Sequence, residues 1–294
     1  MFDLEEEHQV FMSQGVEAYA RLQRKQENEP LKPGAAFEVS RRLLALNTPG
    51  EPKVVDIVLL SKNSPDLSLR AFNSFEKFGL GISRGSFTSG RSVAPFVRAW
   101  GADLFLSNDH EDVVAAGVAG TAAARLGPAP DPLGDDPSDE VRIAFDGDAV
   151  VFSPESDMVY KEKGLEGFLE HERENARIPM EYGPLGTAFF PKLAKLRKHF
   201  MRRDGTSRVR ISIVTARNAP AHERVVHTLR AWGTPADEAH FVGTHDKGAI
   251  LMATRAHIFF DDQEKHVESA RSSVAAGLVP GPHQPATPVI PAGD

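Results

Sequence analysis

Short apolar runs and amphipathic segments alternate along this chain and predict strands and helices in turn. The first block predicts strands at 54–60, 85–88 and 103–106, and helices at 66–78, 92–100 and 111–125. The second block predicts strands at 141–145, 210–214, 239–242 and 257–260, and helices at 221–232 and 247–254. Strands that alternate with helices in this way indicate a parallel sheet with helices on its faces.

Three further stretches depart from this alternation. Residues 5–29 predict a helical arm whose candidate buried positions are Val10, Phe11, Val16, Tyr19 and Leu22. Residues 153–208 are polar and favour helix, and prolines recur through 279–294. We therefore predict an N-terminal helical arm (1–50), an N-terminal α/β block (51–127), a core (140–152 and 209–278), an inserted segment (153–208) and a flexible tail (279–294).

The two α/β blocks resemble each other. At an offset of 154 residues, identities recur between Gly79 and Gly233, Phe87 and Phe241, Ala102 and Ala256, Phe105 and Phe259, and Val113 and Val267. A duplicated unit and a chance result of the common strand–helix period both remain open. The charges differ, because Ser107 and Asn108 stand where the second block has Asp261 and Asp262.

Size and composition narrow the class of protein. The 294 residues, 41% hydrophobic and 26% charged, are enough for a large α/β domain with a second lobe. A formal charge of −7 offers no general attraction to nucleic acid or an anionic membrane, so local cations or a metal would have to hold an anionic substrate. The absence of cysteine excludes disulfides and thiolate catalysis, and we find no signal peptide or apolar span. We expect a cytoplasmic protein that binds neither nucleic acid nor membrane and is compatible with a homo-oligomer.

Polar residues gather where the predicted strands end. These residues are Asp146 and Asp148, Thr215, Lys247, Asp261 and Asp262. Because ligands bind at the carboxyl ends of parallel strands, we expect these side chains to converge. Carboxylates suit Mg²⁺, with Asp146 and Asp261 as the expected side-chain ligands, and an ammonium and a hydroxyl suit phosphate oxygens. The set predicts metal-assisted phosphoryl transfer with Asp146 as the attacking carboxylate.

These motifs and their order resemble the haloacid dehalogenase superfamily and, within it, the cytosolic 5′-nucleotidase I family. The four superfamily motifs correspond to Asp146-Gly147-Asp148, to Thr215 in Ile213-Val214-Thr215-Ala216-Arg217, to Lys247, and to Phe259-Phe260-Asp261-Asp262-Gln263. The narrower resemblance covers nearly the whole chain. It implies a Rossmann-like haloacid dehalogenase core with a mainly parallel sheet, a cap at 153–208 inserted after the first catalytic strand, and an N-terminal α/β block resembling the core.

The resemblance also implies a role for each motif. Asp146 would be the nucleophile, and Asp148 would protonate the leaving ribose oxygen and then activate water. Thr215, Ala216 and Lys247 would bind the substrate phosphate. Mg²⁺ would be held by Asp146, by the backbone carbonyl of Asp148 and by Asp261, with support from Asp262. The implied reaction is hydrolysis of a nucleoside 5′-monophosphate to nucleoside and phosphate through an aspartyl phosphate.

Other interpretations of these residues remain open. Asp146 and Asp148 also suit a strand-end turn, Lys247 suits an exposed first helical turn, and Asp262 suits a helix N-cap. Arg217 could reach a substrate phosphate or hold Asp148 or Asp262 in place. The chain could also be a haloacid-dehalogenase-type phosphatase for another small phosphomonoester, or a catalytically silent nucleotide-binding regulatory protein.

One asparagine and three aromatic residues are candidates to recognise the nucleoside. Where the family carries two asparagines after its first strand, this chain has Ser61-Lys62-Asn63, so Asn63 is a candidate to contact the substrate or to support a contact. Phe152, Tyr182 and Phe189 are candidates to stack on a base or to pack the cap.

Overall fold

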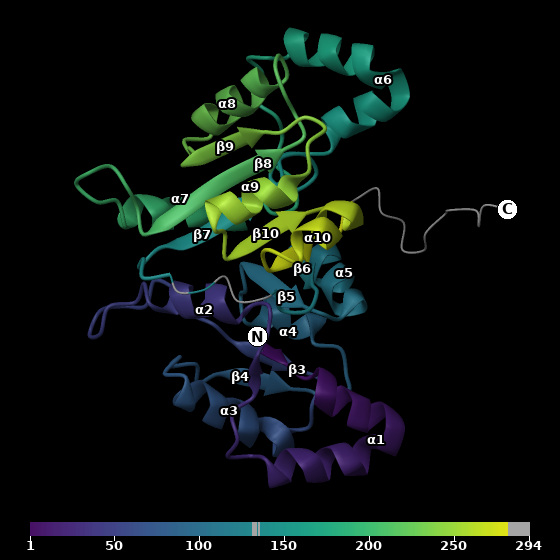
Figure 1. The fold of residues 1–294 in the computed structure, drawn as a ribbon, viewed down its shortest axis with the longest axis vertical. Coiled ribbons are helices and arrows are strands. Elements are labelled where there is room, and N and C mark those ends of the chain that lie inside the picture. The colour runs from purple at the N-terminus through teal and green to yellow at the C-terminus, as the bar shows by residue number, and fades with distance from the viewer. Residues whose placement is uncertain (131–133, 135, 282–294) are drawn as a thin grey trace, which may run out of the picture.

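The computed structural model describes residues 1–130, 134 and 136–281, and its largest element is a seven-stranded sheet (Figure 1). In spatial order its strands are β5 (Leu104–Ser107), β6 (Ala122–Leu126), β11 (Ala276–Leu278), β10 (Ile258–Asp261), β7 (Val141–Phe145), β8 (Val209–Thr215) and β9 (Glu238–Phe241). Neighbouring strands are parallel except β6 and β11, which are antiparallel. The predicted α/β fold with a mainly parallel sheet is confirmed.

Helices cover both faces of this sheet. On one face lie α2 (Phe37–Leu44), α7 (Phe189–His199) and α8 (His222–Ala231), whose apolar side chains share a core with Phe145 and Ile211. On the other face α9 (Lys247–Thr254) and α10 (Glu264–Ala270) pack with Ala144 and Phe259, and α4 (Ala94–Ala99) and α5 (His110–Val118) cover β5 and β6. The central strand β7 is buried on both faces, which explains its nearly continuous apolar sequence.

The range 153–208 contains two helices with different placements. Helix α6 (Glu155–Glu174) bends at Gly164, where φ is 67°, and extends beyond the edge of the sheet (Figure 1). Helix α7 instead lies against the sheet, where Phe190 and Leu193 join the main core. The two helices of the range predicted as a cap therefore differ in placement.

The N-terminal region carries two small sheets. Strands β1 (Phe2–Asp3) and β2 (Lys32–Pro33) pair antiparallel, and β3 (Leu59–Ser61) and β4 (Gly85–Phe87) pair parallel. The helices here are α1 (Glu5–Lys25), η1 (Pro65–Leu67) and α3 (Ser68–Lys77). The prediction that Phe11 and Val16 are buried is wrong, since their exposed fractions are 39% and 66%. Gly15 lies between them at φ 82° and breaks the helical periodicity on which that prediction depended.

Two predicted elements have different bounds in the structure. The strand predicted at 54–60 is confined to β3 at its end. The helix predicted at 111–125 stops at Val118, and its second half is strand β6. Gly120, at φ 85°, redirects the chain, and the alanines that follow pair with β5, while Arg125 and Leu126 pair with β11. Tertiary pairing has overridden their helix propensity. Of the tail predicted at 279–294, residues 282–294 lie outside the described residues.

The internal repeat is visible in the positions of the elements. The bounds of α3 and α8 are offset by 154 residues, and so are those of β5 and β10. The strand registers agree as well, because Ser61 pairs with Phe87 in one block and Thr215 pairs with Phe241 in the other. Agreement in both position and register favours a duplicated unit over chance.

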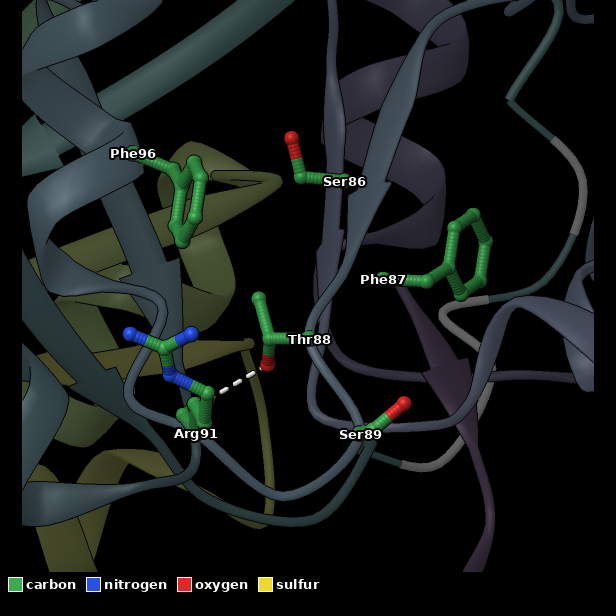
Figure 2. A pocket seen from close by; sticks show the side chains of 6 residues that line it. All are labelled: Ser86, Phe87, Thr88, Ser89, Arg91 and Phe96. Carbon is green, nitrogen blue, oxygen red and sulfur yellow. Dashed lines mark hydrogen bonds between the residues drawn. The ribbon is translucent and has the colours of Figure 1, made fainter.

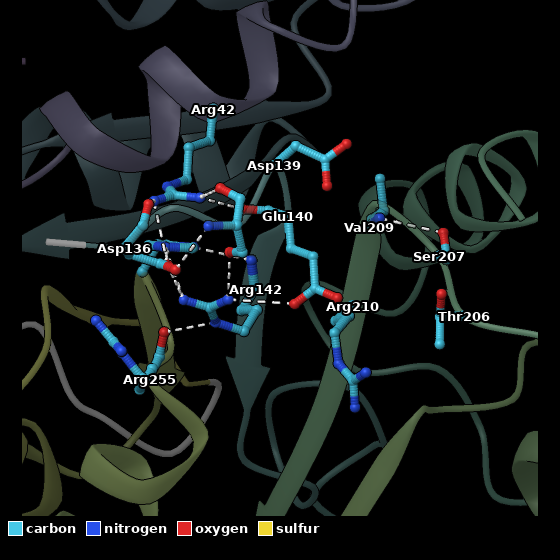
Figure 3. A network of polar contacts seen from close by, with 12 residues as sticks. Arg42, Asp136, Asp139, Glu140, Arg142, Thr206, Ser207, Val209, Arg210 and Arg255 are labelled. Atoms are coloured by element: carbon cyan, nitrogen blue, oxygen red, sulfur yellow. Dashed lines mark hydrogen bonds and ion pairs between the residues drawn. The ribbon is translucent and has the colours of Figure 1, made fainter. Parts of the chain in front are cut away.

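A polar network at the amino end of β7 joins the N-terminal arm to the core (Figure 3). Arg42 of α2, only 6% exposed, donates to the carbonyls of Ser138 and Glu140, each at 2.7 Å. Arg142 of β7 forms ion pairs with Asp136 and Glu140 and donates to the carbonyl of Arg255. These contacts fix the end of β7 that lies opposite to Asp146.

Candidate active site

Asp146 follows β7 at the carboxyl edge of the large sheet and is 4% exposed. Its backbone N–H donates to the carbonyl of Phe260 at 2.8 Å, which extends the pairing of β7 with β10. The N–H of Gly147 donates to Asp146 Oδ1 at 2.7 Å. A Cβ on Gly147 would lie 3.2 Å from Thr215 Oγ1, so this glycine lets the loop approach the end of β8 closely.

Lys247 links Asp146 to the neighbouring strand. Its Nζ lies 3.0 Å from Asp146 Oδ1 and 2.7 Å from Asp261 Oδ2, and the lysine is 3% exposed. Helix α9 begins at this residue, where the side chain of Asp246 caps the helix by accepting from the N–H of Gly248 at 2.7 Å. Lys247 is therefore a buried partner of two carboxylates and not an exposed helical residue.

His266 joins the same cluster, although the sequence prediction did not include it. Its Nδ1 lies 3.1 Å from Asp261 Oδ2, and Asp261 Oδ1 accepts from the N–H of Gln263 at 2.8 Å. Asp262, beside it, is 2% exposed. His266 lies in the first turn of α10, five residues after Asp261. This short spacing from the last motif is the sequence feature that could have identified it.

Burial and mutual repulsion shape the electrostatics of the cluster. Burial, together with the nearby charges of Asp261 and Asp148, raises the pKa of Asp146 well above its usual value, although Lys247 opposes the shift. Burial alone would lower the pKa of Lys247, but the two carboxylates outweigh it and the pKa is raised. Burial would raise the pKa of Asp261, but His266 and Lys247 lower it. Lys247 therefore does not fully compensate the negative charge of ionised Asp146.

These groups form a possible acidic metal site. Asp146, Asp261 and His266 each offer one ligand atom, and the three atoms lie within 4.8 Å of one another. Two carboxylates fit a hard divalent cation, and the raised pKa of Asp146 indicates that more positive charge would be accommodated there. Asp148, whose backbone carbonyl is the predicted ligand, directs its carboxylate to Arg217.

Arg217 holds Asp148 after the turn that follows β8. Its Nε and Nη2 donate to the two carboxylate oxygens of Asp148 at 2.8 and 2.7 Å. Its backbone N–H lies 3.3 Å from Thr215 Oγ1, so Thr215, Ala216 and Arg217 form one turn beside Gly147. Of the roles left open for Arg217, the structure shows the one in which it holds Asp148.

The candidates for nucleoside recognition are dispersed. Asn63 follows β3 in the small sheet and accepts from the hydroxyl of Tyr19 at 3.0 Å. Phe152 is fully buried, so the suggestion that it stacks on a base is wrong. Tyr182 is 45% exposed but stacks on Trp232, with ring centroids 4.1 Å apart. Phe189 is half-buried against Phe145.

Two surface pockets occupy equivalent places in the two repeats. The pocket in Figure 2, about 310 Å³, is lined by Ser86, Phe87, Thr88, Ser89, Arg91 and Phe96. The other, about 740 Å³, is lined by residues of β9 and the start of α9, with Phe241 and Ile250 in the places of Phe87 and Phe96. Neither pocket is lined by Asp146, Lys247, Asp261 or His266. The two pockets therefore reflect the architecture that the repeats share.

Comparison with known proteins agrees with the motif order. A family model described as 5′-nucleotidase matches residues 1–285. The chain belongs to the 5′-nucleotidase family. It is also 34% identical to human cytosolic 5′-nucleotidase 1B over 287 residues, which are 94% of this chain and 47% of that protein. The chain thus spans about half the length of the curated relative it matches.

No solved structure matches the chain significantly. None of the helices in the described part of the chain is long and apolar enough to cross a membrane.

Proposed function

We propose that the protein is a Mg²⁺-dependent enzyme that hydrolyses nucleoside 5′-monophosphates to nucleoside and phosphate in the cytoplasm. The observation that carries this proposal is the buried contact of Lys247 with both Asp146 and Asp261 in a chain of the 5′-nucleotidase family. A lysine between two carboxylates at the carboxyl edge of a parallel sheet, together with a divalent cation on those carboxylates, suits a phosphate dianion better than a neutral substrate.

In the proposed reaction, Asp146 attacks the phosphorus atom. The bond from its carboxylate oxygen to phosphorus forms while the bond from phosphorus to the ribose 5′-oxygen breaks, and Asp148 gives that oxygen a proton. Asp148 then takes a proton from water, which attacks the aspartyl phosphate, releases inorganic phosphate and restores Asp146. Lys247 and the turn from Thr215 to Arg217 orient the phosphoryl group. Mg²⁺, held by Asp146 and Asp261 with the backbone of Asp148, would neutralise charge on the phosphoryl oxygens.

A phosphate-release assay over a panel of nucleoside monophosphates and sugar phosphates, with and without Mg²⁺, tests this function. We expect nucleotide turnover that requires the metal. Asp146→Asn should reduce turnover by about 10³-fold or more because the nucleophile is lost, and Asp148→Asn by roughly 10²–10⁴-fold. Asp66→Asn, which changes an exposed aspartate paired with Arg24, is the matched control and should retain activity.

Each alternative predicts a different result in this assay. Faster turnover of sugar phosphates would favour a phosphatase for another phosphomonoester. Nucleotide binding without turnover would favour a silent regulatory protein. Undiminished phosphate release by Asp146→Asn would overturn the mechanism.

A further inference from the structure

We propose that Glu172 of α6 is a positioning residue that acts through Arg217 to orient the carboxylate of Asp148. This inference rests on the proposed function, because it concerns the residue assigned to protonate the leaving group. It extends that function by adding a carboxylate from outside the four motifs to the groups that control the chemical step.

The contact between Arg217 and Asp148 is a fork. Both carboxylate oxygens accept from one edge of the guanidinium, at 2.8 and 2.7 Å, and Arg217 is 4% exposed. A two-pronged contact fixes the rotation of a carboxylate as well as its position. The orientation of Asp148 is thus determined by the orientation of the guanidinium.

Glu172 holds the remaining edge of that guanidinium. Its Oε2 forms a short ion pair with Arg217 Nη1, and its side chain has no exposed surface. Its Oε1 accepts from the hydroxyl of Ser156 at 2.7 Å and from Arg224 at 3.1 Å. Glu172 therefore has a fixed partner on each oxygen and cannot follow Arg217 if the arginine moves.

A contribution to stability alone does not account for this arrangement. Desolvating a buried ion pair costs about as much as the pair returns, and apolar residues of similar volume often replace one without loss. Arg224 is already held by Glu155 at 3.1 Å and by the carbonyl of Ile178 at 3.0 Å. What Glu172 adds is a second contact to the guanidinium of Arg217, whose other edge holds Asp148.

The identity of the leaving group provides a test. The ribose 5′-oxygen leaves as an alcohol, so it needs the proton from Asp148 while the bond from phosphorus to oxygen breaks. p-Nitrophenolate is a stable anion and leaves without that proton. A defect in the orientation of Asp148 should therefore slow release of nucleoside and spare release of p-nitrophenolate, whereas a general loss of structure should slow both.

The experiment measures the first-turnover rate of leaving-group release by rapid quench in the 294-residue chain with Mg²⁺. The two substrates are p-nitrophenyl phosphate and the nucleoside monophosphate that is hydrolysed fastest in the panel. For Glu172→Gln we expect a fall of roughly 10–10² in the nucleotide rate, little change in KM and little change for p-nitrophenyl phosphate. Arg217→Lys keeps the charge but loses the fork, so it should show the same selectivity for the leaving group.

Two controls separate positioning from structure. Ser156→Ala removes one partner of Glu172 Oε1 but leaves Arg224 on that oxygen and Arg217 on the other, so both rates should stay near those of the wild type. In the Asp148→Asn background, Glu172→Gln should produce no further loss, because residues that act through one group are not additive.

The outcomes distinguish this inference from the proposed function. Equal losses on both substrates, or an additive loss in the Asp148→Asn background, would show that Glu172 is only structural, and the proposed function would stand. If Asp148→Asn itself slowed both substrates equally, the role proposed for Asp148 would fail, and this inference would fail with it.

Discussion

At the scale of single residues, order along the chain indicated three of the side chains that meet at the sheet edge, but not His266. Asp146 and Asp261 follow adjacent parallel strands, so their convergence with Lys247 could be predicted from the rule that places ligands at strand ends. Glu172 could not be found in this way. It lies 24 residues after Asp148 on a polar helix, and only the packing of α6 against α8 brings it to Arg217.

The raised pKa of Asp146 leads to a prediction about stability. A folded-state pKa above the unfolded value means that ionised Asp146 destabilises the fold near neutral pH. Asp146→Asn should therefore raise the melting temperature of metal-free protein by roughly 2–4 °C, the shift that about 1 kcal/mol produces in a domain of ordinary size, while abolishing turnover. Thermal unfolding with EDTA checks this.

The same melting experiment repeated with Mg²⁺ provides the control. Bound metal should stabilise the wild type and have a smaller effect on Asp146→Asn, because the variant lacks one ligand charge. If the variant melts below the wild type in EDTA, the charge of Asp146 does not destabilise the folded protein.

At the scale of elements, the sequence predicts strands with branched residues better than strands of alanine. The run Val209–Thr215 could be recognised as a strand, but Ala122-Ala123-Ala124 in β6 has the composition of a helix. Its conformation is decided by β5 on one side and β11 on the other. Neither pairing is visible locally, and β11 lies more than 150 residues further along the chain.

The segment between α6 and α7 passes close to the loop that follows β7 and carries Asp148, and a glycine permits this approach. A Cβ at Gly186 would lie 2.1 Å from the carbonyl oxygen of Val151, which is a backbone atom that cannot move alone. Gly186→Ala should destabilise the protein by about 1–3 kcal/mol and lower activity, because the displaced backbone belongs to the loop that carries Asp148. Urea unfolding and the phosphate-release assay measure the two effects.

Gly117→Ala is the matched control for this substitution. Gly117 is an exposed residue of α5, and no atom lies within 4 Å of its potential Cβ. Alanine there should stabilise the protein by roughly 0.5–1 kcal/mol. Equal changes in the free energy of unfolding for the two substitutions would show that the close approach of Gly186 to Val151 does not affect stability.

At the scale of the whole molecule, the two repeats differ by one strand. In the second repeat, β7 lies between β10 and β8 and continues the sheet to β9. In the first, β3 and β4 form a separate pair, and in the described residues no strand joins them to β5. Asp146 follows the strand that the first repeat lacks, so the first repeat has no counterpart of this residue.

We expect the polar network at the amino end of β7 to be sensitive to pH through His257, which contacts Arg142 and Asp136. His257 Nδ1 accepts from the backbone N–H of Arg142 at 2.9 Å, which requires this nitrogen to be unprotonated. Burial and the charges of Arg42 and Arg142 lower its pKa to about 4, and Glu38 and Asp136 oppose the shift only in part.

Because the unfolded chain binds this proton at a higher pH than the folded protein, the free energy of unfolding should fall as the pH drops from about 6.5 to 4. The loss should be on the order of 3 kcal/mol over that interval. Urea unfolding at pH 7 and pH 4.5 measures it. His257→Gln can accept the same hydrogen bond without titrating, so it should lose less stability than the wild type. His8→Gln, at an exposed position of α1, should behave as the wild type does. An equal loss in wild type and His257→Gln would assign the pH dependence to other groups.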